Sequence, residues 1–159
     1  MSVTAAQGFR AAGVRAGLRA HGERPDVALV VNDGPTQVAA GVFTRNQVKA
    51  APVLWSQQVL VEHDLRAVVL NAGGANACTG PQGFQDTHAT AEHAAARLTA
   101  ASPRLVVGAA DIAVCSTGLI GERLPMPKLL AGIDAAVRGL GRDGGAAAAE
   151  AIMTTDTRP

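Results

Sequence analysis

The sequence predicts an α+β layered sandwich, in which helices pack against a sheet built mainly from the first half of the chain. Apolar runs typical of strands come early, whereas segments with helical spacing of apolar residues come later. A regular alternation of strands and helices, which would indicate a doubly wound parallel sheet, is absent from the pattern. At 159 residues the chain is expected to form a single domain with a sizeable core and no second domain.

Segments rich in apolar and β-branched residues indicate strands in the first half. Residues 26–32 (DVALVVN) and 38–44 (VAAGVFT) flank a cluster of turn residues at 33–36, so we expect them to form a hairpin. Residues 52–55 (PVLW) are expected to add a short strand. Proline has no backbone N–H to donate, and this loss is tolerated at the first position of a strand.

Two further predicted strands each end in small residues and glycine. Residues 66–70 (RAVVL) lead into a loop at 71–80 (NAGGANACTG), and residues 111–115 (DIAVC) stop at the Ser-Thr-Gly of 116–118. A strand that stops there brings two hydroxyls and a flexible backbone N–H to one point. Preorganised groups of this kind build the oxyanion holes of acyl-transfer enzymes. An ordinary strand-to-loop turn explains the same residues, so this local pattern does not decide the function.

Three later segments have the composition of helices. Residues 86–100 are rich in alanine and begin near a favourable N-cap residue. Residues 127–140 place apolar side chains at helical spacing and carry a proline in the first turn. Residues 146–153 form a third, alanine-rich helix that leads directly into Thr154.

Composition argues against several classes of function. The net charge is +1, with acidic and basic residues interspersed, so nothing indicates a surface for nucleic acid or anionic membranes. No apolar run approaches the roughly 20 residues that span a bilayer. Residues 1–10 lack the apolar segment of a secretory signal, so we expect a cytoplasmic protein.

Metal and redox chemistry are not expected either. Cys78 and Cys115 lie far apart and form no C-x-x-C pair, so we expect buried free thiols. The histidines lack the H-E-x-x-H spacing of metal ligands and are expected to be surface or capping residues. They are His21, His63, His88 and His93.

The glycine loop at 71–80 has more than one interpretation. A strand followed by Asn-Ala-Gly is similar to an element of short-chain dehydrogenases, but the chain has no tyrosine and no G-x-G-x-x-G match. Alternatively, Asn71 and Asn76 present their amides to a ligand, while Gly73 and Gly74 allow another backbone to approach. A tight connection whose asparagines tolerate the left-handed conformation accounts for the loop equally well.

Four segments in this order resemble the ornithine acetyltransferase family, the bifunctional glutamate N-acetyltransferases and amino-acid acetyltransferases of arginine biosynthesis. They are residues 41–46 (GVFTRN), 71–80 (NAGGANACTG), 115–121 (CSTGLIG) and 151–157 (AIMTTDT). Each motif is weak alone, but four in register from about residue 8 to residue 159 make a specific match.

The resemblance implies a precursor that cleaves itself into α and β chains, which stay associated as a cytoplasmic heterotetramer or larger assembly. The threonine that begins the β chain is the nucleophile. It carries acetyl from N-acetylornithine to glutamate by a ping-pong route without a metal or coenzyme, although some members also accept acetyl-coenzyme A. The implied fold is an α-β-β-α layered sandwich, as in the self-processing aminopeptidases, and the β chain completes it.

The resemblance also assigns residues. Thr117 and Gly118 match the oxyanion-hole pair, and Thr154 matches a threonine that contacts substrate. Asn71 and Asn76 are carried over only as supporting groups near the site. The nucleophile has no match here, so residues 1–159 are expected to be most of an α chain that is inactive without its β chain. A pair of threonines bonding to carbonyls at a helix end is the other interpretation of Thr154.

Two alternatives stay open, one from another functional class and one within the same superfamily. One is a stand-alone domain that binds a small molecule with the glycine loop. The other is a related hydrolase or acyltransferase of a secondary-metabolite cluster. The extensive match at residues 43–52 (FTRNQVKAAP) favours the arginine pathway, and a partner chain beginning with threonine would separate an α subunit from a stand-alone domain.

Overall fold

A computed structural model describes residues 2–20, 22–102 and 106–158. In these residues a sheet of four strands has the order β1-β2-β3-β4. The strands are β1 (Phe9–Val14), β2 (Val27–Asn32), β3 (Ala67–Gly74) and β4 (Ile112–Leu119). The β1–β2 and β2–β3 pairs are antiparallel and the β3–β4 pair is parallel. The mixed α+β content agrees with the predicted class.

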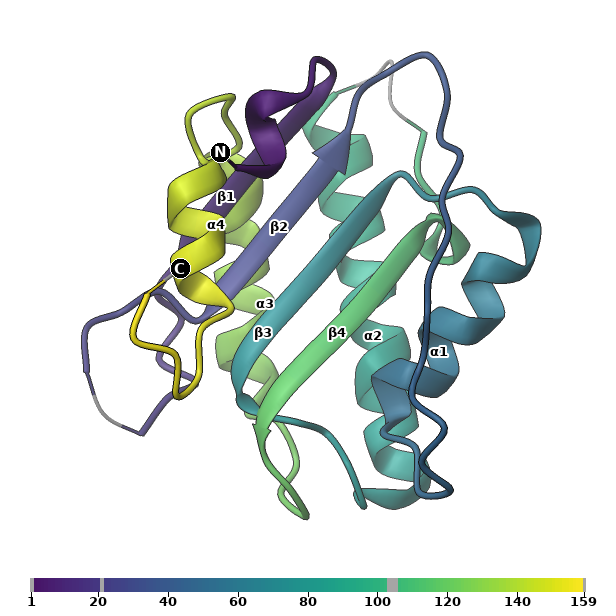
Figure 1. The fold of residues 1–159 in the computed structure, drawn as a ribbon, viewed down its shortest axis with the longest axis vertical. Coiled ribbons are helices and arrows are strands. Elements are labelled where there is room, and N and C mark those ends of the chain that lie inside the picture. Colours follow the sequence, from purple (N-terminus) through teal and green to yellow (C-terminus); the bar gives the residue numbers. More distant parts are fainter. Residues whose placement is uncertain (1, 21, 103–105, 159) are drawn as a thin grey trace.

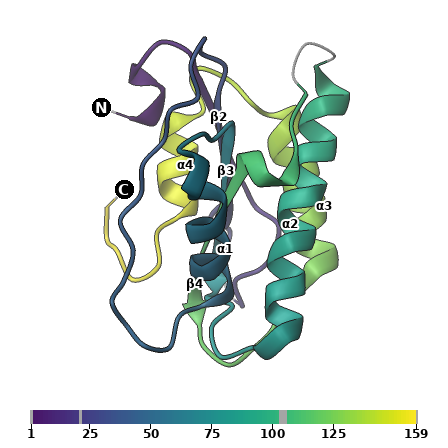
Figure 2. The ribbon, with the colours of Figure 1, turned by 90° about the vertical axis from the view of Figure 1, so that its right-hand side faces the viewer.

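Helices lie on both sides of this sheet. They are α1 (Ala51–Val59), α2 (Gly80–Ala101), α3 (Met126–Arg138) and α4 (Gly145–Ala151), with single 3₁₀ turns η1 (Val3–Ala5), η2 (Leu60–Glu62) and η3 (Ala109–Asp111). Behind the sheet in Figure 1 lie α2 and α3, whereas α4 lies in front of β1 and β2. The side view confirms that α4 and the α2–α3 pair occupy opposite sides (Figure 2).

The face of the sheet that meets α2 and α3 carries the core. Every second residue of the strands points to this face, and the large side chains there are at most 3% exposed. They are Val27, Leu29, Val31, Val69, Ile112 and Val114. Helix α3 adds Leu129 and Ile133, both 0% exposed, because residues four apart share one helix face. We call this the helix-covered face.

The other face of the sheet is covered only in part. Helix α4 packs against β1 and β2 through alanines, and the approach is so close that a Cβ on Gly13 would lie 2.0 Å from the Ala147 carbonyl oxygen. Over β3 and β4, the described part of the chain places no helix on this side (Figure 1). Half-buried or exposed side chains form this open face, namely Val30, Val68, Leu70, Cys115 and Thr117.

Helix α1 closes part of the outer edge of β4. Trp55 Nε1 donates to the Ile112 carbonyl oxygen at 2.9 Å. Ser56 Oγ donates to the Val114 carbonyl oxygen at 2.7 Å and accepts from the Val114 N–H at 3.0 Å. These bonds satisfy edge groups that would otherwise be free to pair with another strand. The helix therefore fixes the position of β4 up to Val114.

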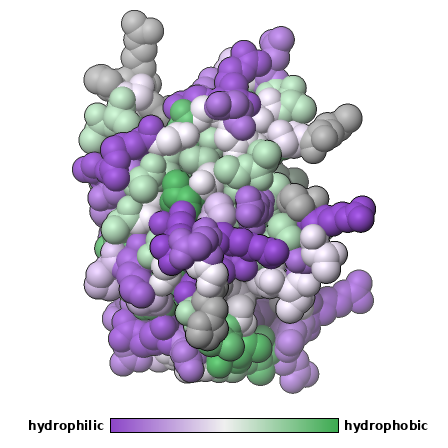
Figure 3. Space-filling model, turned by 90° about the vertical axis from the view of Figure 1, so that its left-hand side faces the viewer, coloured by the Kyte–Doolittle hydropathy of each residue, from purple (hydrophilic) through white to green (hydrophobic). Residues whose placement is uncertain are grey.

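The β1 edge is closed differently. Ala11 exchanges two backbone hydrogen bonds with Gly141, and Arg10 pairs with Asp33, a hydrogen bond that raises the pKa of Arg10. Figure 3 looks at this side of the molecule and shows hydrophilic and hydrophobic residues mixed over its surface. This edge is therefore a mixed surface, closed in part by Gly141 and by the Arg10–Asp33 pair.

The strands predicted at 26–32 and 66–70 and the three predicted helices are confirmed, with shifted bounds. The strand predicted at 38–44 is wrong. The segment contributes only an isolated bridge between Val38 and Asp64, because β1 and β3 already occupy both edges of β2. The true hairpin partner of β2 is β1, which the sequence analysis did not identify.

Two other boundaries are corrected. Residues 52–55 lie in α1 and not in a strand. Pro52 stands in the first turn of this helix, where a backbone N–H has no acceptor within the helix, so proline is tolerated there. The strand expected to stop at Cys115 continues to Leu119, because β3 extends to Gly74 and pairs with it residue by residue. The predicted loop at 71–80 is thus shared among β3, a short connection and the first residue of α2.

Candidate functional site

The carboxyl ends of β3 and β4 meet at two glycines. In the parallel register Asn71 lies opposite Ser116, and Gly73 lies opposite Gly118. Gly73 has φ +117° and Gly118 has φ +131°, which side-chain-bearing residues rarely adopt. A Cβ on Gly118 would lie 2.5 Å from the carbonyl carbon of Gly73. Glycine is therefore required where the two strand ends touch.

The neighbouring hydroxyls of β4 point to opposite faces of the sheet. Ser116 Oγ donates to Asn71 Oδ1 at 2.6 Å on the helix-covered face. Asn71 is 2% exposed, and its Nδ2 donates to the Gly74 carbonyl oxygen at 3.1 Å. Thr117 lies on the open face, and its hydroxyl has no hydrogen-bond partner among the described residues. The predicted site residue is thus the hydroxyl that remains available.

The N–H of Gly118 is directed to the outer edge of β4. The Val114 N–H points away from β3 to Ser56, and residues two apart along a strand direct their backbone groups to the same side. Gly118 itself is exposed and lies beyond the last contact that α1 makes with the edge. The Thr117 hydroxyl and the Gly118 N–H therefore lie where the open face meets the uncovered edge, a place we call the donor corner.

Thr154 belongs to the segment that follows α4, and this segment lies toward the end of the sheet where β3 and β4 have their carboxyl ends (Figure 1). Thr154 is exposed, and its N–H donates to Asp156 Oδ2 at 3.0 Å. Within the described residues the structure gives the Thr154 side chain no hydrogen bond to a helix carbonyl. The interpretation of Thr154 as a helix-end residue therefore has no such bond in support.

Asn76 lies in the connection between β3 and α2. It is 0% exposed and has φ +48°. Its Nδ2 donates to the Gly83 carbonyl oxygen at 2.8 Å and to Thr87 Oγ1 at 2.9 Å, while its Oδ1 accepts from Thr79 at 2.7 Å. The amide is fully used in holding the connection to α2, so any support for the site is indirect.

A pocket of about 400 Å³ adjoins Gly73 and Gly74 and was not anticipated from the sequence. Gly73 and Leu119 line it, together with residues 17–20, 122–125 and Lys128. Its cationic side chains are already engaged. Arg123 makes two hydrogen bonds to Asp86, which raise the pKa of Arg123, and Lys128 Nζ donates to the Gly17 carbonyl oxygen. Because the walls come from three distant segments, no local motif indicates this pocket.

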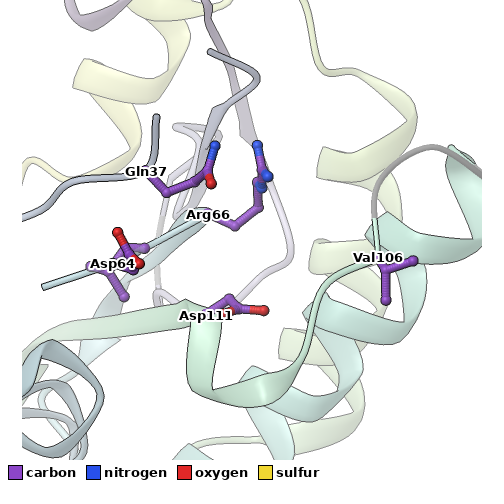
Figure 4. Close-up of a pocket in the computed structure, with 6 residues that line it drawn as sticks. Gln37, Asp64, Arg66, Val106 and Asp111 are labelled. Atoms are coloured by element: carbon purple, nitrogen blue, oxygen red, sulfur yellow. The ribbon is translucent and has the colours of Figure 1, made fainter. Parts of the chain in front are cut away.

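A second pocket, of about 210 Å³, lies at the opposite end of β3. Figure 4 shows Arg66 and Gln37 on one side of it and Asp64 and Asp111 on the other. Arg66 Nη1 donates to the Asn32 carbonyl oxygen at 2.9 Å. None of the predicted site residues lines this pocket. The predicted chemistry and this charged pocket are therefore separate features of the sheet.

Both cysteines are exposed, so the expectation of buried thiols is wrong. Burial nevertheless raises the pKa of the Cys115 thiol, because neighbouring groups remove part of its hydration although the residue reaches the surface. Among the described residues no three His, Cys, Asp or Glu side chains are grouped as a metal site would require. His21 lies outside the described residues. No described helix is both long and apolar enough to span a bilayer.

Comparison with known proteins gives consistent matches over the whole chain. The model of the ArgJ family matches residues 10–159. The chain is 65% identical over 157 residues to the arginine biosynthesis bifunctional protein ArgJ of Thermobifida fusca. It is also 65% identical over 159 residues to the protein of that name from Mycolicibacterium paratuberculosis. Each alignment covers 99% of this chain but 39% of the relative, so the chain spans well under half the length of these relatives.

Two solved structures share the fold. The ornithine acetyltransferase of Mycobacterium tuberculosis, crystallised with ornithine, is 62% identical with a TM-score of 0.95, covering 99% of this chain and 81% of that chain. The ArgJ protein of Bacillus halodurans is 37% identical with a TM-score of 0.85, covering 99% of this chain and 78% of that chain. The arrangement of strands and helices described above is thus found in both proteins.

Proposed function

Because this chain belongs to the ArgJ family, we propose that it forms most of the α chain of an ornithine acetyltransferase. The assembled enzyme transfers acetyl from N-acetylornithine to glutamate in arginine biosynthesis. The observation that carries the proposal is the donor corner, where the Thr117 hydroxyl and the Gly118 N–H have no partner among the described residues. Such a corner supplies half of an acyl-transfer site and needs a nucleophile from elsewhere.

The proposed mechanism uses these two groups as an oxyanion hole. The hydroxyl of the threonine at the start of the β chain attacks the acetyl carbonyl carbon, and the carbonyl electron pair moves to oxygen. The free amine of that threonine accepts the hydroxyl proton and returns a proton to the leaving amine as the C–N bond breaks. Glutamate then attacks the acetyl ester by the same route. Each hydrogen-bond donor aimed at the oxyanion typically lowers the barrier by about 3 kcal/mol.

The remaining predicted residues take supporting roles in this proposal. Thr154 contacts the polar atoms of the acyl donor. Asn71 bonds to Ser116 on the helix-covered face and supports the end of β4 from the side opposite Thr117. Asn76 acts only through the connection to α2. No metal or coenzyme takes part in the transfer, and acetyl-coenzyme A is a second candidate acetyl donor.

A β chain from the same precursor covers the open face and completes an α-β-β-α sandwich in this proposal. The half-buried Val68 and Leu70 supply an apolar surface for a second sheet. Obligate interfaces of this kind commonly exceed roughly 2,000 Å². Two or more such αβ pairs form the cytoplasmic enzyme, and the isolated α chain is inactive and aggregates.

The decisive experiment expresses this chain together with the β portion of its precursor. Acetylglutamate formation is measured with N-acetylornithine plus glutamate, and separately with acetyl-coenzyme A plus glutamate. We expect transfer from N-acetylornithine, self-cleavage before a threonine, and no activity from residues 1–159 alone. A chain that stays monomeric and binds a small molecule without a partner would instead support the stand-alone domain.

A further inference from the structure

A buried carboxylate holds the loop that precedes β2. Asp26 is 1% exposed, and its Oδ1 accepts the N–H of Ala16 at 2.6 Å. Its Oδ2 accepts the N–H groups of Leu18 at 2.6 Å and Arg19 at 3.2 Å. The Asp26 backbone is itself fixed, since it bonds to Val14 and Ala72 in the sheet. Hydrogen bonds to an ionised acceptor are stronger than neutral ones, so residues 16–19 are held firmly to the sheet.

This loop contacts both segments that carry predicted site residues. The Arg19 guanidinium donates to the carbonyl oxygens of Ala151, at 3.3 Å, and Met153, directly before Thr154. On its other side, the loop lies against Gly73. A Cβ on Gly73 would stand 2.7 Å from the Leu18 carbonyl oxygen. Gly73 in turn touches Gly118. A continuous line of contacts therefore joins Thr154 to the donor corner.

We propose that Arg19 is a positioning residue for Thr154, held in place by Asp26 and setting the position of the substrate-contacting segment relative to the oxyanion hole. The inference rests on the proposed function. Arg19 touches backbone carbonyls rather than the reacting atoms, and it also balances the negative end of α4. The donor corner is fixed by the β3–β4 pairing, in which Thr117 and Gly118 lie opposite Ala72 and Gly73. Loss of Arg19 therefore weakens binding of the acyl donor and leaves the chemical step nearly intact.

Lysine should replace Arg19 in part. Both bonds to the carbonyl oxygens come from one guanidinium nitrogen, Nη2, so a single ammonium can donate to the same two oxygens. The Nε of Arg19 is buried without a hydrogen-bond partner in the described part of the chain, so lysine loses no bond at that place. The flexible stem of lysine holds its ammonium less firmly than the planar guanidinium is held. The conservative variant should restore part of the function.

The test uses the assembled αβ enzyme and steady-state kinetics with N-acetylornithine and glutamate. Arg19→Met should raise KM for N-acetylornithine about tenfold, since hydrogen bonds from a charged group are lost, with kcat changed less than about twofold. Arg19→Lys should raise it about threefold. Arg15→Met is the matched control, because Arg15 is exposed and pairs with Glu23 rather than with the 151–153 segment.

Epistasis with Thr154 separates positioning from a general structural role. Thr154→Val should raise KM several-fold, and adding Arg19→Met should raise it little further, because Arg19 acts through Thr154. An unchanged KM in Arg19→Met, a loss confined to kcat, or additive effects in the double variant would overturn the inference. If Arg19→Met does not assemble, the same criteria apply to Arg19→Lys. A wild-type assembly without acetyl transfer would instead overturn the proposed function, and the inference with it.

Discussion

The two faces of the sheet differ in how completely they are covered, although their residues are chemically alike. Val69 points to the helix-covered face and is 0% exposed, whereas its neighbour Val68 points to the open face and is only half-buried. A sheet with one face in water normally alternates apolar and polar residues. Strand β3 is apolar on both faces, which is the pattern of a strand buried on both sides. The open face therefore has the composition of an interior surface.

Exposed apolar side chains on the same side of the sheet strengthen this comparison. The segment at 33–50 runs on the α4 side of the sheet (Figure 2), and in it Val42 is 100% exposed and Val38 is 79% exposed. Leu119 and Ile120, just after the donor corner, are 59% and 69% exposed. These groups lie around an uncovered apolar surface, and a second layer would bury them together.

Substituting glutamate for Val69 or for Val68 should have the largest effects and should distinguish the two faces. Val69→Glu places an unpaired carboxylate in the interior, a cost of several kcal/mol that approaches the whole stability of a typical domain. We expect no folded chain and no assembled enzyme. Val68→Glu should leave the sheet intact and make the isolated chain more soluble, yet prevent it from purifying with its β chain.

Circular dichroism and size-exclusion chromatography distinguish these outcomes. Normal assembly of the Val68→Glu variant would show that the open face is not the surface covered by the β chain. A folded Val69→Glu chain would contradict the assignment of the core.

The two adjacent hydroxyls of β4 give a sharper test of function. Thr117→Ala should lower kcat by roughly 10²–10³ with little change in substrate affinity, because it removes a hydrogen bond made mainly in the transition state. Thr117→Ser should keep much of the activity. Ser116→Ala is the matched control on the helix-covered face. It loses the bond to Asn71, worth about 1 kcal/mol of folding stability, and should change kcat little.

Self-cleavage offers a second measurement on the same variants. If processing passes through an oxyanion at the donor corner, the Thr117→Ala precursor should mature slowly on denaturing gels. A fully processed Thr117→Ala enzyme with near-wild-type kcat would remove Thr117 from the mechanism.

The smallest expected effect is on the alkylation rate of the Cys115 thiol, which lies on the open face. Thiolate forms above the pKa, and burial raises the pKa of Cys115, so a smaller fraction is reactive at pH 8 than in the unfolded chain. In a Cys78→Ser background we expect several-fold slower alkylation by iodoacetamide in the assembled enzyme than in urea. The pKa contribution should shrink as the pH rises past 9, whereas the protection given by a covering β chain should remain. Equal rates at pH 8 would show that the face stays open.

Local sequence pattern predicted the strands at 26–32 and 66–70 because their apolar runs are continuous and bounded by turn residues. The strand β1 was not identified because it is rich in small residues and lacks a continuous run of large apolar side chains. Its Gly13 is required by the approach of α4, a tertiary contact that the sequence does not display. The run at 38–44 was misassigned because a run of apolar residues does not by itself show whether the segment pairs with a neighbouring strand.

The donor corner was predictable in its residues and not in its geometry. The family resemblance pointed to Thr117 and Gly118, and the structure shows which neighbouring hydroxyl faces the open side. That choice depends on β4 continuing to Leu119 in register with β3, and pairing register is a long-range property. The link from Arg19 to Ala151 and Met153 could not be predicted, since it joins residues that lie 132 and 134 positions apart in the chain.

The contact of Ser56 with both backbone groups of Val114 bears on how isolated chains would associate with one another. Fibril growth adds strands edge to edge, which needs a free row of backbone groups on the outer strands. Here α1 occupies much of one outer strand, and Gly141 and Arg10 interfere with the other. Molecules that meet through their uncovered valines and leucines therefore stack face to face. Precipitates of the isolated chain should be amorphous and bind little thioflavin T.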